Sequence, residues 1–145
     1  MYFVDRKKIE ATLVYIDEQI RIFESQMSWE ADLERKALER ISHLIIEGIL
    51  DVGNAMIDGF IMRDPGSYED IIDILLDEKV IHQADADGFK NLISLRKSLV
   101  QEYLTINHRE LEKTYQDHLP SLQAFSGNIR EYLNNELGPV SAFKP

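Results

Sequence analysis

The sequence predicts an all-α protein, an up-and-down bundle of four to five helices in a single domain over residues 1–145. Two observations support this fold class. Hydrophobic residues recur with a period near 3.6 along most of the chain, and no segment shows a convincing strand pattern. With 145 residues, of which 44% are hydrophobic and 29% charged, the chain can bury a core of its own.

The first helix is expected after Asp5, whose carboxylate can accept a hydrogen bond from the free N–H groups of the first turn. Its apolar residues follow one another at alternating spacings of four and three, which places them on one helical face. These residues are Ile9, Leu13, Ile16, Ile20 and Phe23.

A second, longer helix is expected after Ser28, a suitable N-cap, and the acidic Glu30 and Asp32 favour the positive end of its dipole. Glycines interrupt it at positions 48, 53 and 59, where small residues would let another backbone come close. Its predicted buried side comprises Leu33, Ala37, Ile41, Leu44, Ile45, Val52, Met56 and Phe60.

A clear break follows, because Pro65-Gly66 predicts a turn. Ser67, with Asp70 three residues later, resembles a capping box for a short third helix that carries Ile71, Ile72, Leu75 and Leu76. After a turn at residues 80–83, a fourth helix is predicted to continue through Tyr103. The side that it should present to the core comprises Phe89, Leu92, Ile93, Arg96, Leu99, Val100 and Tyr103.

A fifth helix is expected at the end of the chain, and Pro120 falls inside it, where it should kink or split the helix. Gly138-Pro139 should end this helix and leave a short tail to Pro145. Its predicted apolar face comprises Leu111, Tyr115, Leu119, Leu122, Phe125, Ile129, Tyr132 and Leu137.

The charge distribution limits the range of partners. A net charge of −10 disfavours whole-surface binding to nucleic acid, since a polyanion is repelled at long range. The charges are uneven, however: residues 64–87 hold eight acids and one base, whereas residues 90–113 hold five bases and three acids. Any contact with phosphate is therefore expected in the second of these segments.

Several protein classes are disfavoured by composition. The absence of cysteine excludes disulfides, thiolate chemistry, zinc ribbons and iron–sulfur clusters. The N-terminal residues lack the pattern of a signal peptide, and no apolar stretch approaches the roughly 20 residues that cross a bilayer. A cytoplasmic protein without a membrane partner is expected.

Two kinds of metal site are suggested by short stretches of the sequence, and the residues fit neither of them. Aligning Gly88 with the sixth position of a calcium loop puts Gln83 first and Ser94 twelfth, where Asp and Glu are required. A di-iron bundle needs Glu-x-x-His pairs, but His43 and His82 each follow a glutamate by four residues. No metal or cofactor is expected.

Arg96 stands out on the predicted fourth helix. It shares an apolar stripe with Tyr103, because seven residues advance about 700°, close to two full turns. An arginine in such a place must pair, extend to solvent or line a cleft. Two interpretations stay open: an internal ion pair with Glu47 or Asp51 in a plain structural bundle, or a functional groove that Arg96 and Tyr103 line, at a dimer interface.

These residues resemble a family motif that consists of Arg, usually Asn, a spacer, His, one residue and Tyr. Arg96 and Tyr103 match the motif, whereas Lys97 replaces the Asn and Gln101 replaces the His. On this basis the chain resembles HepT-like proteins of the HEPN superfamily, and more closely the YutE-like branch. Supporting similarity lies at residues 65–70, 75–81, 92 and 136–144.

The resemblance implies a dimeric helical bundle with the motif helices facing a shared cleft. HepT-like members are toxins of bacterial toxin–antitoxin pairs that cut RNA without a metal, and a nucleotidyltransferase partner adenylylates the motif Tyr. Carried over to this chain, the catalytic positions are Arg96 and Gln101, the phosphate-binding residues are Arg96 and Lys97, and the modified residue is Tyr103. DNA is not an expected partner.

The departure at Gln101 bears directly on activity. Metal-free RNA cleavage moves protons, which His does well near neutral pH, whereas a glutamine amide cannot exchange a proton there. We therefore expect weak or absent cleavage unless His43 or His108 enters the cleft from elsewhere. The alternative is a non-catalytic dimeric module that binds a protein partner such as a nucleotidyltransferase.

Overall fold

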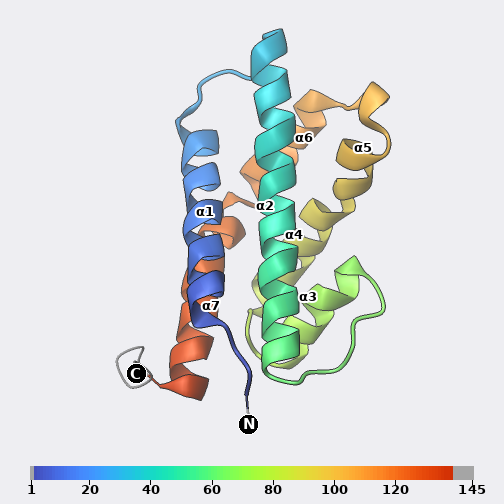
Figure 1. Ribbon diagram of the computed structural model, residues 1–145. Coiled ribbons are helices and arrows are strands. Elements are labelled where there is room, and N and C mark those ends of the chain that lie inside the picture. Colours follow the sequence, from blue (N-terminus) through green and yellow to red (C-terminus); the bar gives the residue numbers. More distant parts are fainter. Residues whose placement is uncertain (1, 139–145) are drawn as a thin grey trace.

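The computed structural model describes residues 2–138, which fold into helices without a strand (Figure 1). The predicted all-α class is therefore confirmed. One continuous apolar core holds the helices together. No helix within residues 2–138 is both long and apolar enough to cross a membrane. The helices are α1 (Arg6–Ser25), α2 (Asp32–Gly59), α3 (Tyr68–Asp77), α4 (Gln83–Ser94), α5 (Arg96–Val100), the 3₁₀ turn η1 (Tyr103–Thr105), α6 (His108–Asp117) and α7 (Leu119–Leu137).

Helix α1 begins where the sequence predicts. The Asp5 carboxylate accepts a hydrogen bond from the Lys8 N–H at 3.0 Å, so Asp5 is the N-cap. The five apolar residues predicted on its inner face are all buried. This face packs along α2, which runs beside α1 through the middle of the bundle (Figure 1).

The start of α2 differs from the prediction. The helix begins at Asp32, and the Glu34 carboxylate accepts the N–H of the N-cap residue Ala31 at 3.0 Å. Ser28 does not cap it; its hydroxyl accepts the Glu30 N–H at 3.3 Å instead. Leu33, predicted to be buried, is 82% exposed. The first turns of α2 extend beyond the neighbouring helices, so none of the helices within residues 2–138 covers Leu33 (Figure 1).

Farther along α2 the predicted buried side is largely correct. Ala37 is exposed and Leu44 is half-buried, while the other predicted residues from Ile41 to Phe60 are buried. Close backbone approach occurs at Gly59, whose carbonyl accepts the Phe3 N–H at 2.9 Å. A Cβ at Gly59 would lie 3.1 Å from the Val4 Cα, which explains the glycine there.

Polar contacts stabilise the turn before α3. The Ser67 hydroxyl accepts the Asp70 N–H at 3.1 Å and caps α3, as predicted. Asp70 does not complete a capping box. Its carboxylate instead binds both terminal nitrogens of Arg63, at 2.7 and 2.8 Å, and the Gly66 N–H at 2.8 Å. The Arg63 guanidinium, and after it the Gly66 N–H, lower the pKa of Asp70 to about 2.

The continuous fourth helix predicted through Tyr103 is wrong. Helix α4 ends at Ser94, and the Leu95 N–H bonds to the carbonyl three residues back, on Leu92, which tightens the chain locally. Helix α5 ends at Val100, where the Lys97 carbonyl accepts the N–H groups of both Gln101 and Glu102, at 2.8 and 3.1 Å. Arg96 and Tyr103 therefore do not share one helical stripe.

The predicted effect of Pro120 is confirmed as a split. Helices α6 and α7 meet at His118, and Pro120 lies in the first turn of α7, where its missing N–H costs little. Helix α7 ends at Leu137, with Gly138 in a positive-φ conformation of 81°. The predicted tail at 139–145 lies outside the described residues.

Candidate functional site

The Arg96 side chain reaches from the start of α5 to the middle of α2. Its Nε donates a hydrogen bond of 2.6 Å to the Oε1 atom of Glu47. Of the interpretations that the sequence left open, the ion pair with α2 is present, and its partner is Glu47 rather than Asp51. The hydrogen bond that Arg96 donates to Glu47 raises the pKa of the Arg96 guanidinium above its already high usual value, so the group remains a cation.

The Tyr68 ring from the start of α3 covers one face of the same guanidinium. The Arg96 Cζ atom lies 4.7 Å from the ring centroid, which is cation–π distance. The guanidinium is thus fixed both at one edge, by Glu47, and on one face, by Tyr68. A group held in this way loses little conformational freedom when it binds a ligand.

The two terminal nitrogens of Arg96 remain without a hydrogen-bond partner among residues 2–138, since only Nε donates there. The Arg96 side chain is only 24% exposed. A partly buried guanidinium with two free N–H-bearing nitrogens is suited to bidentate binding of a phosphate.

A cavity of about 420 Å³ lies beside this guanidinium, between α3, the end of α4 and α5. Three of the four residues singled out in the sequence, Arg96, Lys97 and Gln101, lie in its wall. Tyr103 is not among the lining residues. It stands on η1 and is 63% exposed. The other lining residues are Ser67, Tyr68, Glu69, Ile93 and Ser94.

A histidine contacts the carboxylate that holds Arg96. His43 lies one turn before Glu47 on α2, and its Nε2 is 3.4 Å from Glu47 Oε1, the oxygen that accepts from Arg96. The His43 side chain is 26% exposed. Of the two histidines left open by the sequence, His43 is the one that lies at the Arg96–Glu47 pair.

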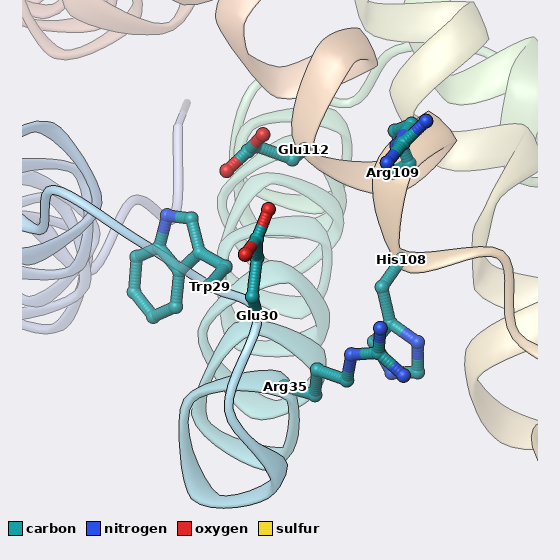
Figure 2. A pocket seen from close by; sticks show the side chains of 6 residues that line it. All are labelled: Trp29, Glu30, Arg35, His108, Arg109 and Glu112. Atoms are coloured by element: carbon teal, nitrogen blue, oxygen red, sulfur yellow. The ribbon is translucent and has the colours of Figure 1, made fainter.

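His108 belongs to a different part of the surface. Its Nε2 lies 2.7 Å from Glu39 Oε2, two turns before Glu47 on α2. Figure 2 shows His108 near Arg35, in the wall of a second cavity of about 420 Å³ that contains none of the motif residues. The other residues of this wall are Trp29, Glu30, Arg109 and Glu112.

Nothing in the sequence singled out Tyr68. Tyr68 and Arg96 are 28 residues apart and lie on different helices, and no periodicity relates them. The His43–Glu47 contact could have been predicted, because the two residues are spaced i,i+4, which brings their side chains together on one helix face.

Comparison with known proteins identifies the family and the fold. Residues 13–129 match the ribonuclease HepT-like family. The chain is 56% identical over 144 residues to YutE of Bacillus subtilis strain 168, a candidate RNase, covering 99% of this chain and 100% of YutE. The solved structure of YutE, a cytosolic protein of unknown function, superposes with a TM-score of 0.95 over 99% of this chain and 100% of that one.

More distant structures share the fold. A toxin–antitoxin structure with AMP-PNP contains a chain that is 19% identical, with a TM-score of 0.73, covering 86% of this chain and 96% of that one. A tri-AMPylated HEPN toxin of Shewanella oneidensis, in complex with an MNT antitoxin, is 21% identical, with a TM-score of 0.71, covering 86% and 95%. The motif, the helical fold and the family match agree: this chain belongs to the ribonuclease HepT-like family of the HEPN superfamily.

Proposed function

We propose that the protein is a toxin-type endoribonuclease that binds RNA and cleaves it without a metal ion, with Arg96 holding the scissile phosphate. The observation that carries this proposal is the state of the Arg96 guanidinium. Glu47 and Tyr68 fix it, while its two terminal nitrogens have no partner among residues 2–138 and lie beside a cavity. A preorganised cation of this kind stabilises the charge that develops on phosphate oxygens during cleavage.

Lys97 and Gln101 have supporting roles in this proposal. Lys97 lines the same cavity and adds a second cation for phosphate. Gln101 stands where the family motif has His, and it can donate and accept hydrogen bonds without exchanging protons near neutral pH. We therefore expect slow cleavage, and faster cleavage when a histidine is restored at position 101.

Regulation through Tyr103 completes the proposal. The exposure of this side chain, 63%, suits modification by a nucleotidyltransferase antitoxin. Two structural neighbours come from toxin–antitoxin assemblies, one of them an AMPylated HEPN toxin with its MNT antitoxin. A homodimer in which two motif regions face one cleft, in the cytoplasm, is the assembly that we propose for this chain.

A non-catalytic protein-binding module is the less favoured alternative. A purely structural role for Arg96 would use its hydrogen-bonding capacity within the fold, yet only Nε is engaged among the described residues. The alternative predicts that RNA neither binds nor is cut, so the same experiment separates the two.

The test is cleavage of a labelled structured RNA in EDTA by wild type, Arg96→Ala and Gln101→His. We expect slow cleavage by wild type, none by Arg96→Ala and faster cleavage by Gln101→His. Lys7→Ala on α1 is the matched control, since Lys7 is exposed and distant in sequence from the motif. If neither wild type nor Gln101→His cuts, and RNA does not bind at low salt, the ribonuclease proposal fails.

A further inference from the structure

We propose that the second cavity binds a guanine base of the RNA and so gives the protein a base preference. The inference rests on the proposed ribonuclease function and deepens it, because it names the RNA feature that is recognised. The cavity measures about 420 Å³, within the range of sites that hold small ligands. Its lining residues are Trp29, Glu30, Arg35, His108, Arg109 and Glu112 (Figure 2).

The charged side chains of this wall are not used by the fold. Two carboxylates, Glu30 and Glu112, and two guanidinium groups, Arg35 and Arg109, line the same cavity. Among the described residues, none of these four side chains forms a hydrogen bond or an ion pair, and only His108 is engaged, by a carboxylate of α2 at 2.7 Å. The hydrogen-bonding capacity of four charged groups therefore remains available at one cavity.

The wall is built on well-fixed parts of the chain. Trp29 and Glu30 belong to the connection between α1 and α2, and the other lining residues come from the starts of α2 and α6. Trp29 is buried, and its ring stacks on that of Phe23 with 6.0 Å between centroids. The Gln26 Nε2 donates a 2.8 Å hydrogen bond to the Glu34 carboxylate and ties this connection to α2. Such a site loses little conformational freedom when it binds a ligand.

The mixture of charges determines the kind of ligand. The carboxylates would repel a phosphate, and the guanidinium groups would repel a metal cation. A ligand that fits both must present hydrogen-bond donors on one edge and acceptors on another. Guanine does so, because N1–H and N2–H donate side by side to a carboxylate, whereas O6 and N7 accept side by side from a guanidinium group. In RNA no other base has two adjacent atoms that carry N–H groups.

The second cavity lies within reach of an RNA strand bound at Arg96. Glu39 binds His108 and Glu47 binds Arg96, so both sites are attached to α2, eight residues apart. Eight residues rise about 12 Å along a helix. At about 3.4 Å for each stacked nucleotide, this span corresponds to about three to four nucleotides. Helices α5 and α6 both pack against α2, and only η1 and short connections separate them. We therefore expect one strand to occupy both sites.

The test measures binding of four single-stranded oligonucleotides that differ at one position in a uridine background. That position holds guanine, inosine without the 2-amino group, 7-deazaguanine without N7, or adenine. Since a bidentate contact discriminates between bases by about 5- to 150-fold, wild type should bind the guanine oligonucleotide tighter than the adenine one by a factor in that range. The two analogues should bind with intermediate affinity.

Removal of the carboxylates should abolish one part of this preference. The double variant Glu30→Ala/Glu112→Ala should bind the guanine and inosine oligonucleotides equally, because no carboxylate remains to accept from the 2-amino group. It should still prefer guanine over 7-deazaguanine. The matched control is Glu18→Ala/Glu131→Ala, whose residues are exposed and lie outside the cavity. This control should keep both preferences.

Removal of the guanidinium groups should have the complementary effect. Arg35→Ala/Arg109→Ala should lose the preference for guanine over 7-deazaguanine and keep that over inosine. Its control is Lys7→Ala/Arg21→Ala, again with exposed residues outside the cavity. Thermal melting checks that each variant folds, and Glu30→Ala alone replaces its double variant if the latter melts early.

Three outcomes would overturn the guanine site while the ribonuclease proposal stands. Wild type that cuts RNA but binds all four oligonucleotides equally has no base preference. Double variants that lose affinity for all four by one factor would show only a general electrostatic effect. GMP that binds wild type as tightly as the guanine oligonucleotide does would assign the cavity to a free nucleotide. If wild type neither binds nor cuts RNA, both proposals fail together.

Discussion

The Tyr68 ring lies against the Arg96 guanidinium, with 4.7 Å between the ring centroid and Cζ, and it brings the start of α3 to the start of α5. The polar turn before α3 fixes the position of this ring, because Ser67 caps the helix. Tyr68 also lines the cavity beside Arg96. The turn between α2 and α3 thus contributes to the candidate site, although it lies nearly 30 residues before the motif.

Removing the Tyr68 ring should weaken RNA binding modestly. A cation–π contact at a half-exposed site is worth about 0.5–1 kcal/mol, so Tyr68→Ala should lower RNA affinity about two- to fivefold. Tyr68→Phe keeps the ring and should bind within error of wild type. Fluorescence anisotropy with a labelled RNA measures both. A Phe variant as weak as the Ala variant would assign the effect to the hydroxyl instead.

The salt dependence of RNA binding should identify which cations contact phosphate. Each phosphate contact contributes about 0.7–0.9 to the slope of log K against log salt. Arg96→Ala and Lys97→Ala should therefore each reduce the slope by nearly one, whereas Lys7→Ala should leave it unchanged. Equal slopes for all three variants would show that the binding is a general electrostatic effect and does not use this cavity.

Modification by a nucleotidyltransferase should occur on Tyr103. Its side chain is 63% exposed on η1, whereas Tyr115 is fully buried. Incubation with ATP and a cognate nucleotidyltransferase should add AMP to Tyr103, seen by mass spectrometry of the digested protein. Tyr103→Phe should abolish the addition and Tyr68→Phe should not. Adenylylation that persists in Tyr103→Phe would place the modified residue elsewhere.

The sequence predicted the fold class well because apolar periodicity reports which face of each helix is buried. Apolar periodicity failed to predict features that depend on how the helices pack against one another. Leu33 fits the apolar pattern of α2, but the first turns of that helix project beyond the bundle. The apolar spacing of the predicted fourth helix also continues through Tyr103, although α5 ends at Val100, where the Lys97 carbonyl accepts two N–H groups. The spacing of apolar residues does not predict backbone hydrogen bonds of this kind.

The candidate site was predictable only in part for the same reason. A charge on an apolar face singled out Arg96 and left its pairing with α2 open beside a functional groove, and the structure shows the pairing. Tyr68 did not follow, because it reaches Arg96 from another helix. His43 was one of two histidines left open, and its contact is with Glu47. Contacts between residues that are far apart in the chain form only when the helices pack, so the sequence of one helix cannot predict them.

The stability of the bundle near the site should depend on Tyr115. Its hydroxyl donates a 2.6 Å hydrogen bond to the Ser42 carbonyl, one residue before His43, and so ties α6 to α2. Burial raises the pKa of this hydroxyl, which keeps its proton in place. Tyr115→Phe should lower the free energy of unfolding by about 1 kcal/mol, measured by urea denaturation with an unchanged m value. An unchanged midpoint would mean that the bond adds no net stability.

The Arg63–Asp70 pair should make stability depend on pH at the acid end. Because Arg63, and after it the Gly66 N–H, lower the pKa of Asp70 from 3.8 to about 2, the carboxylate stays charged in the folded protein after it would be protonated in the unfolded chain. This contribution is therefore present above about pH 4 and disappears as the pH falls towards 2.

Asp70→Asn removes that contribution, so its unfolding midpoint should fall less steeply than that of wild type between pH 4 and pH 2. Asp58→Asn is the matched control, because Asp58 is exposed and forms no ion pair within residues 2–138. Chemical denaturation at a series of pH values gives the slopes. Equal slopes for wild type and Asp70→Asn would mean that the pair forms equally in the unfolded chain, since only a difference in proton binding between the two states produces a slope.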